Sequence, residues 1–406
     1  MDRLAVQYLE SGPDIAHIAP RDAQRRLHLA FGHLPISDVL VGWNLPEPLI
    51  RVCVEETNRA SAWLYRWHPL LTGDGTSVPR LEWQSVGLGG DPVPGFQDMP
   101  EFTFVCPNRP GVRSGVLGHL RELCESGLYQ GIFLDRIRYP SPAPDPAAFL
   151  ACFCEDCCRA AAAEGFDLEA ARRRIGELLS SPDGVQSAVN VLLNRHATDA
   201  APDDSNLASL GAFLEFRARI VSRIVQEASH VIRASGLKVG LDCFSPCLAY
   251  MVGQDLNALD SCCDWVKIMT YGHALGPAGL PFEILALTNW LTEQHGLEEP
   301  DALACVSRAT RLALPSTCYE LRRRGLLSAA LADQVYRARC SGIRSLFAGV
   351  ELVELKGISN LSPAQIRSDL RAIRSANPDG MVLSWDLWHI PLDRLDLVRD
   401  VWMLDR

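Results

Sequence analysis

Two carboxylates each end an apolar run of the sequence. Asp135 directly follows the apolar residues 132–134, and Glu351 follows residues 348–350 in the same way. Hydrolysis of a glycosidic bond needs two carboxyl groups, one to protonate the leaving oxygen and one to act as nucleophile or to activate water. We predict Asp135 as the nucleophile and Glu351 as the acid/base, with Asp242 as the first alternative for the second role and Asp386 as a further reserve.

Aromatic, amide and basic side chains recur near the ends of the same apolar runs. Flat aromatic faces beside hydrogen-bonding groups suit a sugar ring, whose C–H faces are apolar and whose hydroxyl groups need partners. The residues predicted to line a sugar subsite are Trp43, Asn44, Trp67, Arg138, Tyr139, Lys267, Tyr271, His273, Trp385 and Asp386.

Each of these assignments has a structural alternative. A carboxylate such as Asp135 could cap a helix or hold a neighbouring arginine, and Glu351 could lie on the surface. Asp242 could orient Lys267 or Tyr271 instead of reacting. The tryptophans could belong to the core, and the histidines are better explained as hydrogen-bonded pocket residues than as acid–base catalysts.

A cysteine cluster is the third chemical signal. Cys152, Cys154, Cys157 and Cys158 have CxC and CxxC spacing, so three or four thiolates could meet one structural Zn²⁺. The sequence has no second CxxC or HxxxH to complete a standard site, although the loop could supply a distant ligand. A reduced, buried turn is the other interpretation. Other cysteines, such as Cys106, lie among apolar residues and are predicted to be free thiols packed as small hydrophobes. No cofactor is expected for catalysis itself.

The elements that must position these residues alternate between short apolar runs and helical patterns. Such alternation predicts parallel strands covered on both faces, and eight units favour an α/β fold of the (β/α)8 TIM-barrel type. Strand ends then converge on one mouth, with the fourth and seventh strands facing each other across it. No GxGxxG or GxxxxGK[ST] follows the first run, which disfavours a nucleotide-binding sheet. The eight predicted strands are 38–43, 61–67, 101–106, 131–137, 237–244, 264–271, 345–351 and 380–386.

The connection after the fourth predicted strand is unusually long. We expect residues 1–406 to form one barrel domain, with residues 141–206 as an inserted helical, cysteine-containing subdomain over the mouth. Loops that follow barrel strands commonly carry function, which motivates this placement.

Composition restricts the partners. The 406 residues include 39 Lys and Arg against 49 Asp and Glu, a net charge of −10, and this balance disfavours nucleic acid and anionic membranes as partners. No apolar run is long enough to span a membrane, and the N-terminal residues lack a signal-peptide pattern, so we expect a cytoplasmic protein. A carbohydrate is the expected partner, and whether the chain forms a homo-oligomer stays open.

The stretch Gly131–Pro140 resembles the fourth-strand signature of glycoside-hydrolase-like TIM barrels, the glycosyl hydrolase-like family 10 group and its relatives. The pattern of residues 153–157 is similar to an FCxxC element of these proteins. Their later strands resemble residues 238–244, 253–255, 264–271 and 384–386. The resemblance implies a barrel fold, a sugar ligand and Asp135 as the leading catalytic carboxylate.

Two departures prevent a better-known mechanism from being carried over whole. Clan-A glycosidases have Asn-Glu at the fourth strand, where this chain has Leu134 and Asp135, and amylase-type enzymes have Arg at the position of Phe133. We therefore predict a glycoside hydrolase of carbohydrate metabolism that acts on an oligosaccharide or a small glycoside. The alternatives are a non-catalytic carbohydrate-binding barrel and a different barrel enzyme, either a lyase or a metal-dependent hydrolase.

Overall fold

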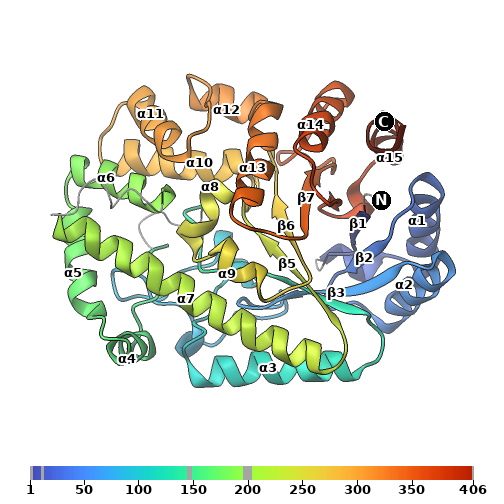
Figure 1. Ribbon diagram of the computed structural model, residues 1–406, viewed down its shortest axis with the longest axis horizontal. Helices are drawn as coiled ribbons and strands as arrows, with labels where there is room; N and C mark the ends of the chain where they lie inside the picture. Colours follow the sequence, from blue (N-terminus) through green and yellow to red (C-terminus); the bar gives the residue numbers. More distant parts are fainter. Residues whose placement is uncertain (1–2, 11–12, 144–148, 195–203, 405–406) are drawn as a thin grey trace.

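Eight parallel strands close into a barrel in sequence order, which confirms the predicted (β/α)8 fold (Figure 1). The computed structural model describes residues 3–10, 13–143, 149–194 and 204–404. Pairing of the first strand with the last closes the barrel, with Leu4 opposite Met381. The strands are β1 (Arg3–Tyr8), β2 (Asp38–Val41), β3 (Trp63–Pro69), β4 (Gly131–Asp135), β5 (Lys238–Cys243), β6 (Trp265–Met269), β7 (Leu346–Glu351) and β8 (Gly380–Ser384).

One predicted strand is wrong and one strand was missed, and these two errors offset each other in the count. Arg3–Tyr8, which the prediction omitted, is β1, whereas residues 101–106 form no barrel strand. They lie in the connection after β3, where Phe104 and Val105 make only isolated antiparallel bridges. That run is apolar because it packs against the barrel, with Phe104 only 2% exposed. In the closed order β4 and β7 are three strands apart, so they do not face each other as predicted.

Helices surround the barrel, and several begin with proline in the first turn, where no backbone N–H bond is lost. The longest, α7, begins after Asp204, whose side chain accepts hydrogen bonds from two backbone N–H groups. Its inward stripe, including Phe213, Ile220 and Ile224, is buried as the sequence pattern predicts. The helices are α1 (Pro20–His33), α2 (Glu47–Ala60), α3 (Pro110–Glu125), α4 (Glu155–Ala163), α5 (Leu168–Leu178), α6 (Pro182–Leu193), α7 (Ser205–Ala234), α8 (Pro246–Ala249), α9 (Leu256–Asp260), α10 (Leu280–Asn289), α11 (Glu299–Thr310), α12 (Cys318–Arg324), α13 (Ser328–Cys340), α14 (Pro363–Ser375) and α15 (Leu392–Val398).

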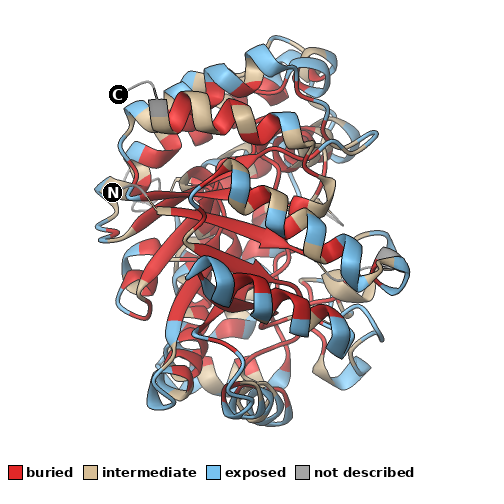
Figure 2. Cartoon of the chain, turned by 90° about the vertical axis from the view of Figure 1, so that its right-hand side faces the viewer, coloured by how far each residue is buried: buried red, intermediate tan, exposed pale blue. Residues whose placement is uncertain are grey.

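The barrel interior is filled by large rings. Phe133 stacks on Trp265 with centroids 5.0 Å apart, and Trp265 lies 4.8 Å from Phe347. Gly240 leaves room for this packing, because a Cβ atom there would stand 2.6 Å from the Trp265 ring. The strands are buried along their length while the helices expose their outer faces (Figure 2). These rings fill the interior of the barrel with packed side chains.

Among the described residues, no helix combines the length and apolar character needed to cross a membrane.

Candidate active site

A cavity of about 630 Å³ opens at the carboxyl ends of the strands. Its floor comes from inward-facing residues of β1, β3, β4 and β5, and its walls come from the connections after β3, β6 and β7. Phe96–Phe102 forms one wall, Leu275–Ala278 a second, and Lys356–Ile358 a third. A separate surface cavity of about 720 Å³, bordered by Arg26 and Trp388, has none of the strand-end carboxylates in its lining.

Asp135 and Asp242 lie side by side on the cavity floor. Leu134 on β4 pairs with Leu241 on the neighbouring strand β5. Asp135 and Asp242 are the next residues of the two strands. Both Asp135 oxygens accept hydrogen bonds, Oδ2 from the Trp67 indole N–H at 3.0 Å and Oδ1 from its neighbour's backbone N–H at 2.5 Å. These two donors fix the orientation of the carboxylate.

Asp242 differs from Asp135 in having one oxygen without a partner. Its Oδ2 accepts a hydrogen bond from Lys267 Nζ at 2.9 Å, whereas Oδ1 is buried and has no hydrogen-bond partner among the described residues. Burial raises the pKa of Asp242 to about 7; the ammonium of Lys267 acts in the opposite direction, and the charge of Asp135 adds to the rise. A carboxyl that titrates near neutral pH beside a cavity is poised to give or accept a proton.

Lys267 is fully buried beneath the cavity and holds Asp242 in place. Its Nζ also donates to Gln7 Oε1 at 2.9 Å, and that oxygen accepts a second bond from Ser384. Burial by itself would lower the pKa of Lys267, but Asp242 and Tyr271 raise it, so the ammonium stays charged. Gly349 on β7 makes room for the side chain, since a Cβ atom there would stand 2.4 Å from Lys267 Cε.

Aromatic side chains and arginines form the walls. Tyr271 and Trp385 lie together, with ring centroids 5.5 Å apart, and both line the cavity. The Arg136 guanidinium lies over the Phe102 ring at 4.7 Å and donates to the backbone oxygen of Glu101 at 2.7 Å. It thereby joins the end of β4 to the wall formed after β3.

Six of the predicted site residues line this cavity. The sequence placed them at strand ends, and the barrel brings them to one space. They are Asp135, Asp242, Trp67, Arg138, Tyr271 and Trp385. The others, which the structure does not place in the cavity lining, are Glu351, Trp43, Asn44, Tyr139, Lys267, His273 and Asp386.

Glu351, the second member of the predicted carboxyl pair, does not line the cavity. It is 4% exposed, and its Oε2 accepts the backbone N–H groups of His273 and Ala274 at 3.1 and 3.0 Å. Its Oε1 accepts the hydroxyl of Ser359 at 2.5 Å. Burial raises the pKa of Glu351, while these hydrogen bonds and His273 act against the rise. The carboxylate therefore ties the connections after β6 and β7 to each other.

Asp386 and His273 also serve the connections between elements. Asp386 accepts backbone N–H bonds from Leu9 and Glu10 after β1, and from Trp388 in its own turn. His273 bonds Asp369 through Nε2 and the backbone oxygen of residue 324 through Nδ1, both at 2.9 Å. Both ring nitrogens then donate, which agrees with a raised pKa: burial would lower it, and Asp369 raises it.

Three further predicted residues are held outside the cavity lining. Trp43 and Asn44 both donate to the backbone oxygen of Asp74, at 2.8 and 2.6 Å. The Tyr139 side chain is buried under the guanidinium of Arg217 at 4.8 Å. In these contacts the three side chains hold neighbouring segments together outside the cavity lining.

The inserted segment 141–206 was predicted to lie over the barrel mouth. Within the described parts of 141–206, no residue lines the cavity. Helices α4–α6 instead form a layer that packs against α7 and α11 (Figure 1).

Several cavity residues were not predicted. Gln7 and Glu10 belong to β1 and its exit, and the short apolar run of residues 4–6 was the signal that could have revealed them. Arg136, next to Asp135, lines the cavity through the guanidinium described above. The walls contributed after β3, β6 and β7 have no local sequence pattern that marks them, because their position depends on how long loops pack.

The cysteine cluster in the structure differs from the predicted set in one residue: Cys106 takes the place of Cys158. Cys106, Cys152, Cys154 and Cys157 bring their sulfur atoms within 4.8 Å of one another, whereas Cys158 is not part of the group. The fourth thiol comes from the connection after β3, far away in the sequence.

Replacement of Glu351 by glutamine is expected to lower the free energy of unfolding and to have little effect on turnover. An amide cannot accept all three hydrogen bonds with the strength of a carboxylate, and an unpaired buried donor costs about 1–3 kcal/mol. We expect the free energy of unfolding to fall by about that amount in denaturant titration. Turnover close to zero in a folded Glu351→Gln protein would return this residue to the catalytic pair.

No protein-family model matches the chain, and a search of curated proteins finds no match. Membership of the glycosyl hydrolase-like family 10 group therefore stays an expectation. Solved structures do match over the full barrel. The chain resembles the glycoside hydrolase domain of PgaB (BpsB) from Bordetella bronchiseptica with a TM-score of 0.55 and 12% identity, over 100% of this chain and 99% of that one.

Two other solved structures are similar at comparable levels. A class V chitinase from Pseudomonas fluorescens Pf-5 matches with a TM-score of 0.50 and 10% identity, over 99% of this chain and 100% of that chain. Alpha-L-fucosidase isoenzyme 2 from Paenibacillus thiaminolyticus matches with a TM-score of 0.52 and 11% identity, over 100% of this chain and 51% of that chain. At these identities the likeness shows the barrel fold.

Proposed function

We propose that this protein is a glycoside hydrolase that cleaves a glycosidic bond in an oligosaccharide or a small glycoside. The observation that carries the proposal is the pair Asp135 and Asp242, adjacent on two strands and open to one aromatic-walled cavity. The fold is shared with proteins named as a glycoside hydrolase domain, a chitinase and a fucosidase, which supports a sugar as the ligand.

The two carboxyl groups have different environments, and these suggest different roles. Asp135 receives two N–H donors, which orient it and stabilise its negative charge, so we assign it as the nucleophile toward the anomeric carbon. Asp242 has the unpartnered oxygen and the pKa of about 7, so we assign it as the acid that protonates the leaving oxygen and later takes a proton from water. This assignment replaces Glu351 by the residue that the sequence had offered as its alternative.

Side chains of the walls would bind the sugar. Trp67, Tyr271 and Trp385 offer ring faces to its apolar C–H surface, and Arg138 offers a cation to its oxygens. Burial lowers the pKa of Arg138 only to about 10, so that it remains charged at neutral pH.

Adjacent strands favour retention of the anomeric configuration. Neighbouring strands lie about 4.8 Å apart, and carboxyl groups about 5–5.5 Å apart belong to retaining enzymes, against about 6.5–9.5 Å for inverting ones. We therefore expect the first product, observed by ¹H NMR during rapid hydrolysis, to have the anomeric configuration of the substrate. Appearance of the opposite anomer first would rule out Asp135 as a covalent nucleophile.

The function itself is tested on a panel of chitooligosaccharides, glucan oligosaccharides and p-nitrophenyl glycosides, including the α-L-fucoside. Reactions in H₂¹⁸O should place one ¹⁸O atom at the new reducing end, as read by mass spectrometry. Cleavage without ¹⁸O and with a new double bond would indicate a lyase. Binding of an oligosaccharide without any cleavage would favour the carbohydrate-binding barrel.

A further inference from the structure

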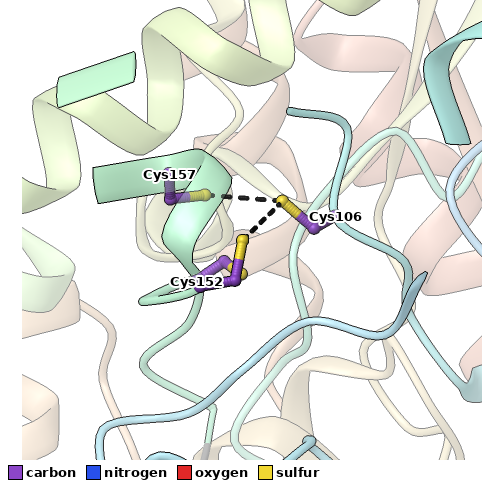
Figure 3. Close-up of side chains that lie close together, drawn as sticks. Cys106, Cys152 and Cys157 are labelled. Atoms are coloured by element: carbon purple, nitrogen blue, oxygen red, sulfur yellow. Dashed lines mark hydrogen bonds between the residues drawn. The ribbon is translucent and has the colours of Figure 1, made fainter. Parts of the chain in front are cut away.

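Four buried thiols meet at one point outside the cavity. The sulfur atoms of Cys106, Cys152, Cys154 and Cys157 all lie within 4.8 Å of one another, and all four residues are buried. Figure 3 shows the side chains of Cys106, Cys152 and Cys157 close together. None of them lines the cavity that holds Asp135. The proposed glycosidase chemistry makes no use of this cluster.

The spacing of the sulfur atoms fits a shared tetrahedral ion. Two thiolates bound to one Zn²⁺ at about 2.3 Å stand about 3.8 Å apart in a tetrahedron. The Cys106–Cys157 and Cys106–Cys154 sulfur distances are 3.4 and 3.6 Å. A disulfide needs about 2.05 Å between sulfur atoms, and all four cysteines are free.

The cluster joins two segments that the sequence separates. Cys106 ends the connection after β3, whereas Cys152 and Cys154 precede α4 and Cys157 lies in its first turn. Cys158, the next residue of the same motif, is directed elsewhere: its sulfur contacts Glu169 Oε1 at 3.3 Å. In the first turn of α4, the Cys157 side chain therefore lies with the other three sulfur atoms, whereas the Cys158 side chain lies apart from them.

Donor groups around the sulfur atoms suit thiolates. The backbone N–H of Val86 donates to Cys152 Sγ, and Asn108 Nδ2 donates to Cys157 Sγ, both at 3.3 Å. Such N–H donors commonly support metal-bound ligands. Arg217 is fully buried; burial lowers its pKa to about 10, while Tyr139 and Cys152 act to raise it, so the guanidinium stays charged at neutral pH. Its positive charge would offset the negative charge of a four-thiolate centre.

We propose that Cys106, Cys152, Cys154 and Cys157 bind one Zn²⁺ as a structural site. Binding converts four thiols into thiolates, so the ion and the chain form a centre of charge −2 and release four protons to solvent. Four protein ligands leave no open position for water or substrate, which is the pattern of a structural site, not a catalytic one. This inference does not depend on the proposed glycosidase activity.

The position of the cluster indicates what the ion would hold together. Cys106 closes the segment after β3 whose residues Phe96–Phe102 form one wall of the cavity. The ion would anchor this segment to the start of α4, behind the wall, while Arg136 holds the wall from the cavity side through the backbone of Glu101. Loss of zinc should therefore loosen a cavity wall without removing any group that reacts.

Metal content decides the proposal, and the chain supplies its own matched control. The full-length protein, prepared without added metal, is compared with Cys106→Ser and Cys158→Ser by elemental mass spectrometry. We expect about one zinc per chain in the wild type and in Cys158→Ser, and about a tenfold loss in Cys106→Ser. Equal loss in the two variants would overturn the assignment of the ligands.

Measurements on the wild type alone guard against a variant that fails to fold. Chelation of the native protein should expose four additional reactive thiols and lower the melting temperature by about 5 °C or more, with recovery on adding Zn²⁺. Replacement by Co²⁺ should yield the visible absorption of a tetrahedral four-thiolate centre. Iron in place of zinc, a disulfide within the four, or a metal-free protein that takes up no zinc would each overturn the proposal.

Discussion

Replacement of Asp135 by asparagine is expected to lower kcat by about 10³-fold or more, because loss of an essential carboxylate removes a group that acts only in the transition state. The substituted amide is nearly the same size, but it cannot attack the anomeric carbon or carry the negative charge that Trp67 and the backbone N–H now stabilise. The measurement is single-turnover and steady-state hydrolysis of whichever glycoside the panel identifies.

Two controls separate this effect from a loss of fold. Asp301→Asn changes an exposed carboxylate on α11, away from the cavity lining, and should keep wild-type turnover. The Asp135→Asn protein should keep its melting temperature within a few degrees and still bind substrate. More than about a tenth of wild-type turnover in Asp135→Asn would remove this residue from the mechanism.

The second large effect is on pH dependence. Asp242 must be protonated to donate to the leaving oxygen, and its pKa is raised to about 7 by burial. A group that acts as an acid loses activity as the pH rises through its pKa, so kcat/KM should fall above about pH 7 and should drop tenfold for each further pH unit. Profiles of kcat/KM from pH 4 to pH 10 on a substrate with a poor leaving group provide the measurement.

Replacing Lys267 should shift the pH profile in a defined direction, which would not happen if Asp242 had only a structural role. Its ammonium, 2.9 Å from Asp242 Oδ2, favours the charged carboxylate and holds the pKa down. In Lys267→Met that attraction is absent, so the pKa of Asp242 should rise and the basic limb should move up by about 1 unit or more. A basic limb that stays in place in a folded Lys267→Met protein would show that Asp242 is not the acid.

Asp242→Asn completes the test. This variant should lose the basic limb near pH 7, and its rate should recover for substrates whose leaving group needs no proton, such as activated p-nitrophenyl glycosides. Equal losses on activated and unactivated substrates would place Asp242 in binding instead of proton transfer.

The sequence alone was enough to predict the fold class and to point to carboxylates at strand ends as candidate site residues. Alternation of apolar runs with helical patterns is a local property, because each strand must bury both faces and each helix one, and eight such units leave the closed barrel as the best solution. For the same reason Asp135 and Asp242 could be named as candidates, because a carboxylate at the end of a buried strand is visible in a few consecutive residues. Their adjacency then follows from parallel strands in order.

The tertiary structure decided which groups meet. Glu351 ends its strand just as Asp135 does, yet the turn after β6 directs two backbone N–H groups onto it and removes it from the cavity. Cys158 lies one residue from Cys157, but the helical turn points the two thiols apart, and Cys106 fills the place from 51 residues away. Such encounters depend on register and on the packing of long loops, and a pattern of nearby residues carries no information about contacts made at that distance.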